Sequence, residues 1–211
     1  MKELYLISGL GADKRVFDFL DLPGFKIHHI EWVEPGDHET VENYAKRLLN
    51  QIRTVKPILI GLSFGGLIAI EIGKLMETEK IILISSAKTR FDLPLYYRIS
   101  GRLGLNKLLP VKRLKKVNDL TFWLFGTTQE AERNLLRTII HDTDNTFLAW
   151  GINKMTTWKN KIRPENAILI QGTDDRILPN KKPDFKIIGG GHFMIVNKAS
   201  EISKLLKHLL G

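Results

Sequence analysis

The residues best suited to chemistry are a serine flanked by glycines, Gly61-Leu62-Ser63-Phe64-Gly65. This Gly-x-Ser-x-Gly run follows an apolar segment typical of a strand and precedes one typical of a helix. So tight a turn strains the serine backbone, and the glycines avoid a Cβ that would strike the neighbouring strand or helix. The hydroxyl of Ser63 then projects from the end of the strand, where the free N–H groups of the helix face any negative charge that forms. The pattern predicts a nucleophilic serine.

A glycine-rich turn of a nucleotide-binding protein is the alternative interpretation of this run. Such turns carry a Gly-x-Gly-x-x-Gly fingerprint or end in Lys-Ser or Lys-Thr, because those residues cradle phosphate groups. Neither feature occurs between residues 61 and 66. We therefore favour the nucleophile.

A serine nucleophile needs a base, and His192 has the best setting among the six histidines. It follows three glycines just beyond the apolar segment 185–188 and precedes the last helical pattern. Loops at the carboxyl ends of strands are where α/β sheets bind their ligands. His28 and His29 lie in a strand-like run and His208 in an amphipathic helix, where structural or surface histidines are common. We expect His192 to be the general base.

The base in turn needs a carboxylate that fixes its tautomer and stabilises the imidazolium. Residues 171–179 read Gln-Gly-Thr-Asp-Asp-Arg-Ile-Leu-Pro and follow another apolar segment. They offer Asp174 and Asp175. Since neighbours in sequence cannot both point at one histidine, these residues by themselves leave the choice open.

Six short segments rich in Ile, Leu and Val must position these side chains, and they are typical of buried parallel strands. They span residues 4–8, 26–32, 57–62, 80–85, 167–171 and 185–188. Helical patterns cover residues 40–52, with Thr40 as a candidate N-cap, and residues 64–76 and 199–210. Strands that alternate with helices predict an α/β fold with a mostly parallel sheet.

Residues 90–160 break this alternation, because they hold several helical patterns and no convincing strand. They lie between the fourth and fifth strand-like segments. We interpret the chain as one domain over residues 1–211, with 90–160 as a helical insertion. Its length fits a single core, given about 100 to 200 residues per domain.

Nucleophile, acid and histidine follow in the order Ser63, Asp175, His192, each after a strand, and the chain resembles the α/β-hydrolase superfamily over nearly its whole length. That superfamily places its acid in a Gly-x-x-Asp-x-Ile/Val-x-Pro-like turn, and this resemblance selects Asp175 rather than Asp174. Its Gly-His-Phe element matches Gly191-His192-Phe193. The resemblance therefore implies a catalytic triad of Ser63, Asp175 and His192.

The resemblance also implies an oxyanion hole built from two backbone N–H groups, those of Phe64 and Leu10. Ser8-Gly9-Leu10-Gly11 occupies the place of the superfamily's His-Gly-x-Gly element. Ser8 replaces the usual histidine, so the support behind this loop must differ. A plain glycine turn after a strand is the alternative.

The implied architecture is a reduced sheet with helices on both faces. The chain starts at the third of the superfamily's eight strands, which leaves six, in the spatial order second, first, third, fourth, fifth and sixth. The strand order then reverses beside Ser63, where open α/β sheets bind ligands. Residues 90–160 correspond to the helical lid over the active site.

Composition excludes several other kinds of chemistry and location. The absence of cysteine excludes disulfides, thiolate zinc sites and cysteine nucleophiles. No apolar run approaches the stretch of about 20 residues that spans a bilayer, and the amino terminus lacks a secretory pattern, so we expect a cytoplasmic protein without a transmembrane segment. No nucleic-acid-binding motif is recognised, and we expect no such partner.

The net charge of +9 is concentrated in residues 90–160, which hold 12 Lys and Arg against 6 Asp and Glu. The densest part is Lys112-Arg113-Leu114-Lys115-Lys116. A solvated helix face is the favoured interpretation. The alternative is attraction of an anionic acyl compound or a membrane surface.

The sequence thus predicts a serine hydrolase that cleaves a carboxylic ester or related acyl bond of a small molecule through an acyl-enzyme. No metal or organic cofactor is expected. A thioesterase, acyltransferase, amidase or carbon–carbon bond hydrolase is the alternative on the same fold. A non-catalytic ligand-binding homologue is an alternative of another class.

Overall fold

The structure is a computed structural model that describes residues 2–105 and 115–211. Its centre is a six-stranded sheet in which every neighbouring pair is parallel, in the order β2-β1-β3-β4-β5-β6. The strands are β1 (Glu3–Ile7), β2 (Lys26–Ile30), β3 (Ile58–Leu62), β4 (Lys80–Ile84), β5 (Ala167–Gly172) and β6 (Phe185–Ile187). The predicted fold class and strand order are confirmed.

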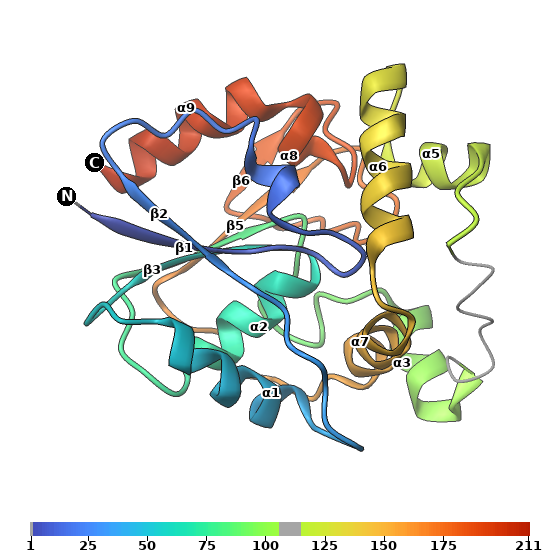
Figure 1. Cartoon of the computed structure of the whole chain (residues 1–211), viewed down its shortest axis with the longest axis horizontal. Coiled ribbons are helices and arrows are strands. Elements are labelled where there is room, and N and C mark those ends of the chain that lie inside the picture. Colours follow the sequence, from blue (N-terminus) through green and yellow to red (C-terminus); the bar gives the residue numbers. More distant parts are fainter. Residues whose placement is uncertain (1, 106–114) are drawn as a thin grey trace.

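Helices cover both faces of the sheet, as predicted (Figure 1). One face carries α1 (Val41–Leu48) and α2 (Phe64–Gly73), and the other carries α8 (Met194–Asn197) and α9 (Ala199–Leu210). Thr40 caps α1, because its side chain accepts a hydrogen bond from the N–H of Asn43 at 3.2 Å. The pattern over 40–52 ends as the 3-10 helix η2 (Leu49–Gln51) instead of continuing as α-helix.

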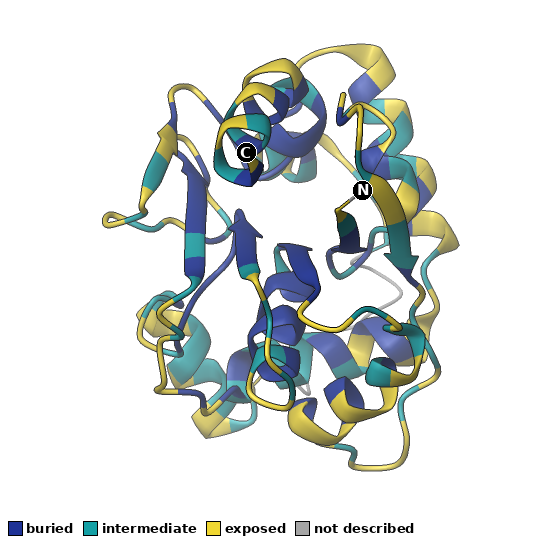
Figure 2. Cartoon of the chain, turned by 90° about the vertical axis from the view of Figure 1, so that its left-hand side faces the viewer, coloured by how far each residue is buried: buried dark blue, intermediate teal, exposed yellow. Residues whose placement is uncertain are grey.

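Alternate residues of the strands enter two separate cores, one on each face. Leu4, Leu6, Ile58, Ile60, Ile82 and Ile84 pack under α8, α9 and the 3-10 helix η1 (Lys14–Phe17). Tyr5, Ile7, Leu59, Ile81 and Leu83 pack against α1 and α2. Because both faces are covered, the central strands are apolar at nearly every position, and Figure 2 shows them buried between the helical layers.

The two edge strands differ from the prediction that all six are buried. Lys26 and Ile27 of β2 and Lys186 of β6 are exposed. An edge strand has a neighbour on one side only, and polar residues along it oppose pairing with another chain. In β2, His28 stacks on Tyr5, with 4.7 Å between ring centroids.

Four described helices fill the insertion between β4 and β5. They are α3 (Leu95–Leu103), α5 (Asp119–Phe125), α6 (Glu130–Asp142) and α7 (Asn145–Thr157). Figure 1 shows all four at the end of the sheet where the strands terminate. Lys112 and Arg113 of the predicted basic cluster lie outside the described residues, and Lys115 donates to the carbonyl of Thr143 at 2.7 Å.

Glu3 joins β1 to its surroundings and makes the fold sensitive to acid. Hydrogen bonds from Thr54, Lys26 and His28 lower the pKa of Glu3 from 4.5 to about 2. Because this pKa lies below the unfolded value, the stabilisation is fully present above pH 4.5 and is lost as the pH falls towards 2. We expect Glu3→Gln to flatten the loss of stability between about pH 5 and about pH 3, measured by urea unfolding. An unchanged loss in the variant would contradict this role.

Candidate active site

Ser63 forms a strained turn between β3 and α2, as the Gly-x-Ser-x-Gly pattern predicts. Its φ is 50° and its ψ is −118°. Positive φ is unfavourable for a residue with a Cβ and persists only where the surroundings enforce it. α2 begins at the next residue, Phe64, so Ser63 stands at the amino end of a helix and at the carboxyl end of a strand.

Glycines allow the backbones around Ser63 to touch. A Cβ on Gly61 would lie 2.5 Å from the Cα of Gly66, and a Cβ on Gly65 would lie 2.2 Å from the carbonyl oxygen of Ser8. Both contacts are with backbone atoms, which cannot rotate away. The turn therefore requires glycine at both positions.

Gly65→Ala should destabilise the fold by about 3 kcal/mol, because the new methyl group collides with the backbone of the loop after β1. Gly36→Ala is the matched control, since its Cβ would meet only the Glu39 side chain, at an ordinary 3.6 Å. Urea unfolding of both variants measures the difference. Equal midpoints for the two would show that the close packing is not essential.

The structure brings Ser63, His192 and Asp175 into one hydrogen-bonded chain. The Oγ of Ser63 lies 3.0 Å from Nε2 of His192, and Nδ1 of His192 lies 2.9 Å from Oδ2 of Asp175. Each residue follows a different strand, β3, β6 or β5. The carboxyl ends of these parallel strands meet at one edge of the sheet, and this edge joins residues far apart in sequence.

Asp175, and not Asp174, faces the histidine. The carboxylate of Asp175 is 4% exposed, and its Oδ1 accepts the N–H groups of Ile177 and Leu178, both at 2.9 Å. Asp174 is exposed and accepts a hydrogen bond from the hydroxyl of Thr173. Of the two aspartates that the residues left open, Asp175 is the one in contact with His192.

Asp175 is held as a carboxylate despite its burial. Burial raises its pKa, but the charge of His192 and the hydrogen bonds from His192, Leu178 and Ile177 outweigh that effect, so the pKa lies below its usual value. An ionised Asp175 accepts a hydrogen bond from the N–H at Nδ1 of His192. Nε2 is then left to face Ser63.

Two further side chains hold this arrangement, and sequence reasoning gave neither of them a role. Gln171 donates from Nε2 to Oδ2 of Asp175 at 2.7 Å and to the carbonyl of Leu178 at 3.0 Å. Ser86 donates to the carbonyl of Ser63 at 2.6 Å. In the sequence, Gln171 and Ser86 stand out only as polar residues at or just after the end of an apolar strand. Many residues with a purely structural role have the same property.

The loop after β1 passes beside Ser63, where an oxyanion hole was expected. A Cβ on Gly9 would lie 3.3 Å from the Cβ of Ser63. Ser8 donates from Oγ to the carbonyl of Ala12 at 3.0 Å, and the N–H of Ala12 donates to the carbonyl of Gly9 at 3.2 Å, so the loop is braced from within. In the described part of the chain, the N–H groups of Leu10 and Phe64 have no hydrogen-bond partner.

A small cavity lies over Ser63, with a volume of about 20 Å³. That volume holds a water molecule but no acyl chain. Its walls are Gly9, Leu10, Gly11, Ala12, Leu62, Ser63, Phe125, Leu136, Ile139, His192 and Phe193. Phe125 of α5 and Leu136 and Ile139 of α6 are among them, so helices of the insertion form part of the cavity wall.

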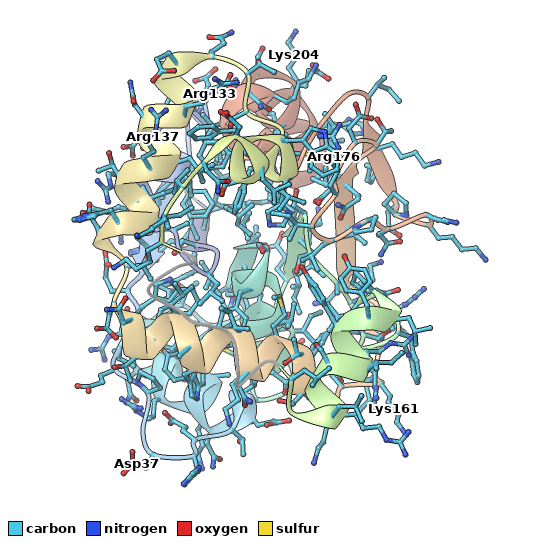
Figure 3. All side chains as sticks on the ribbon, turned by 90° about the vertical axis from the view of Figure 1, so that its right-hand side faces the viewer. Asp37, Arg133, Arg137, Lys161, Arg176 and Lys204 are labelled. Carbon is cyan, nitrogen blue, oxygen red and sulfur yellow. The ribbon has the colours of Figure 1, made fainter. Side chains whose placement is uncertain are left out.

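Helix α5 is fastened to both loops that carry the histidine and the acid. The N–H of Phe193 donates to the carbonyl of Phe125 at 2.9 Å, next to His192. Arg176, next to Asp175, donates to the carbonyl of Trp123 at 2.8 Å and lies 4.5 Å from the centre of its ring. Figure 3 shows Arg176 beside this helix. The carboxyl end of α5 is therefore tied to both loops.

The histidines set aside in the sequence lie elsewhere. His28 bonds to Glu3 at 2.8 Å within the sheet, and His208 lies in α9. The described residues hold no group of three or more His, Asp or Glu side chains placed to bind a metal ion. No helix among them has the length and apolar character needed to cross a membrane.

The likeness of this chain to known proteins lies in its structure and not in its sequence. No protein-family model matches the chain, and no curated protein matches it in sequence. Solved structures do match. A thermophilic esterase from Thermogutta terrifontis has a TM-score of 0.71 at 16% identity over 100% of this chain and 89% of the other.

Two further solved structures show the same likeness. A hydrolase from Pseudomonas aeruginosa PA01 has a TM-score of 0.73 at 15% identity, over 100% of this chain and 90% of the other. An esterase from Exiguobacterium antarcticum has a TM-score of 0.69 at 13% identity, over 99% and 91%. The chain has the α/β-hydrolase fold.

Proposed function

We propose that this protein is a serine hydrolase that cleaves a carboxylic ester or related acyl bond, with Ser63 as nucleophile, His192 as general base and Asp175 as the acid that orients it. The observation that carries the proposal is the unbroken chain of hydrogen bonds from Ser63 through His192 to Asp175. It starts at a serine in a strained turn before a helix. The esterases among the structural neighbours are consistent with ester chemistry.

Acylation begins when Nε2 of His192 accepts the hydroxyl proton of Ser63 and Oγ forms a bond to the substrate carbonyl carbon. The carbonyl electron pair moves to oxygen, and the N–H groups of Leu10 and Phe64 stabilise that oxyanion, together with the amino end of α2. The oxyanion then re-forms the carbonyl, the bond between that carbon and the alcohol oxygen of the ester breaks, and the imidazolium, stabilised by Asp175, donates its proton to that oxygen. Water repeats the sequence on the acyl-enzyme and releases the acid and free Ser63.

Residues 90–160 act in this proposal as a lid within a single domain. The cavity over Ser63 is too small for an acyl group. Phe125 of α5 and Leu136 and Ile139 of α6 line this cavity, so we propose that these two helices separate to admit the substrate. A small-molecule acyl substrate would then enter between them.

A panel of p-nitrophenyl esters of increasing chain length tests this function, with a thioester and an anilide of one acyl group beside them. We expect turnover of the ester to exceed that of the thioester and the anilide. Faster turnover of the thioester or the anilide would show that the preferred substrate is a thioester or an amide instead of an ester. Absence of turnover from a folded protein would favour a ligand-binding homologue.

A further inference from the structure

Helix α3 turns its apolar side to solvent. Four large apolar residues of this helix are about half exposed or more, namely Leu95 (61%), Tyr96 (56%), Ile99 (48%) and Leu103 (65%). Leu95, Ile99 and Leu103 recur every four residues and so form one stripe along the helix. A surface helix ordinarily turns such a stripe towards the core.

Close packing fixes this orientation of α3. On the opposite side of the helix, a Cβ on Gly101 would lie 2.3 Å from the carbonyl oxygen of Thr156 in α7. Tyr97 packs against the core that lies under α1 and α2. The half-buried residues of α3 are Tyr97, Arg98, Ser100 and Gly101. The helix cannot roll to bury Leu95, Ile99 and Leu103 without losing the contact with α7.

The exposed stripe continues beyond both ends of the helix. Phe91 is 60% exposed and Leu105 is 50% exposed. We call the set the α3 apolar surface, and it consists of Phe91, Leu95, Tyr96, Ile99, Leu103 and Leu105. Single exposed apolar residues are ordinary on proteins, but a contiguous group marks an interaction surface.

Positive charge surrounds this surface. Arg90 and Arg98 lie 5.8 and 5.9 Å from the centre of the Phe91 ring, and Arg102 is exposed on α3. The helix itself contains no acidic residue. The nearby carboxylate of Asp92 accepts hydrogen bonds from the N–H and hydroxyl of Thr89.

Apolar side chains among arginines fit a negatively charged lipid surface better than they fit a second copy of this chain. Lipid headgroups attract the arginines while the apolar side chains enter the boundary of the acyl region. A symmetric dimer through this face would bring the arginines of both copies together, and like charges oppose association.

The α3 apolar surface also lies at the end of the molecule that holds the candidate active site. In Figures 1 and 3, α3 stands with α5, α6 and α7 at the end of the sheet where the strands terminate. On α5, Leu120 and Trp123 are 62% and 56% exposed. A membrane that contacts these helices would lie close to the opening of the site.

We propose that the α3 apolar surface docks onto an anionic lipid surface, and that the esters cleaved at Ser63 are amphiphilic acyl esters held in that lipid. The docking rests on the α3 apolar surface and on the arginines beside it, and it does not depend on the proposed function. The substrate class rests on the proposed function. The two parts are therefore tested by separate measurements.

Flotation of the full chain with vesicles tests docking, with Ser63→Ala as the protein so that no substrate is consumed. We expect binding to phosphatidylcholine vesicles that contain phosphatidylglycerol, weakened by salt, and little binding to phosphatidylcholine alone. Ile99→Gln/Leu103→Gln should weaken binding about tenfold. Arg102→Gln should weaken it about fivefold, as one basic contact to an anionic surface predicts.

Val55→Gln is the matched control, because Val55 is 86% exposed and precedes β3, at the opposite end of the strands. It should bind vesicles like the parent protein. Absence of binding to the anionic vesicles, or equal binding by Ile99→Gln/Leu103→Gln, would overturn the docking. A dimer that the double variant abolishes, without vesicle binding, would assign the surface to a second copy instead.

Measurements of ester turnover test the substrate class separately from the proposed function. The wild-type chain and Ile99→Gln/Leu103→Gln should cleave a soluble short-chain ester equally. The double variant should cleave a long-chain ester held in anionic vesicles about tenfold more slowly, in proportion to its lost binding. Equal rates on the vesicle ester would overturn the substrate class. No turnover of any ester by wild type would reject the proposed function and leave vesicle binding to decide the docking.

Discussion

Ser63→Ala should lower ester turnover by about 10⁴-fold or more, because it removes the hydroxyl that we propose as the nucleophile. The hydroxyl of Ser63 makes its one hydrogen bond to His192, and the backbone of the turn is held by other contacts. We therefore expect the unfolding midpoint to change little. Steady-state kinetics with a p-nitrophenyl ester and urea unfolding measure the two effects.

Ser86→Ala is the matched control for this variant. Ser86 is a buried neighbour whose hydroxyl donates to the carbonyl of Ser63, so its loss should cost about 1 kcal/mol of stability. The nucleophile itself stays in place, and most of the turnover should remain. Similar losses of turnover in Ser86→Ala and Ser63→Ala would contradict the assignment of Ser63.

Asp175→Asn should lower turnover by about 10⁴-fold, while Asp174→Asn should change it little. An asparagine amide carries no charge and can turn its NH2 group towards Nδ1, which then accepts a hydrogen bond instead of donating one, so His192 takes the wrong tautomer towards Ser63. Asp174 is exposed and makes its hydrogen bond to Thr173. The two substitutions are chemically identical and one residue apart, so each controls for the other.

The comparison is made by steady-state kinetics on one ester, with circular dichroism to check that both variants are folded. A loss in Asp174→Asn that exceeds the loss in Asp175→Asn would reverse the assignment. Comparable small losses in both would show that His192 works without an acidic partner. Either result would contradict the role of Asp175 as the acid that orients His192.

The strands, Ser63 and His192 could be predicted from the sequence because their signals are local, whereas the choice of Asp175 over Asp174 came from the resemblance. Runs of Ile, Leu and Val marked strands covered on both faces, and each of Ser63, Asp175 and His192 follows one of them. Parallel strands end at a common edge, so residues after different strands meet in space. The resemblance then supplied the strand order.

Features that depend on packing between distant segments could not be predicted in this way. The outward apolar face of α3 results from the contact of Gly101 with α7, which no periodicity reveals. The hydrogen bond from Gln171 to Asp175 and the contribution of α5 and α6 to the cavity wall over Ser63 are likewise tertiary contacts. The exposure of β2 results from its position at the edge of the sheet, where its one neighbouring strand is β1.

The central claim is that Ser63 is an activated nucleophile, and labelling with a fluorophosphonate tests it most directly. The chain has seven serines, and a phosphonate adduct forms on a serine whose hydroxyl a base has activated. Intact mass followed by peptide mapping should show one adduct, located on Ser63, and none on Ser63→Ala. An adduct on another serine, or no adduct on the folded wild-type chain, would contradict the account.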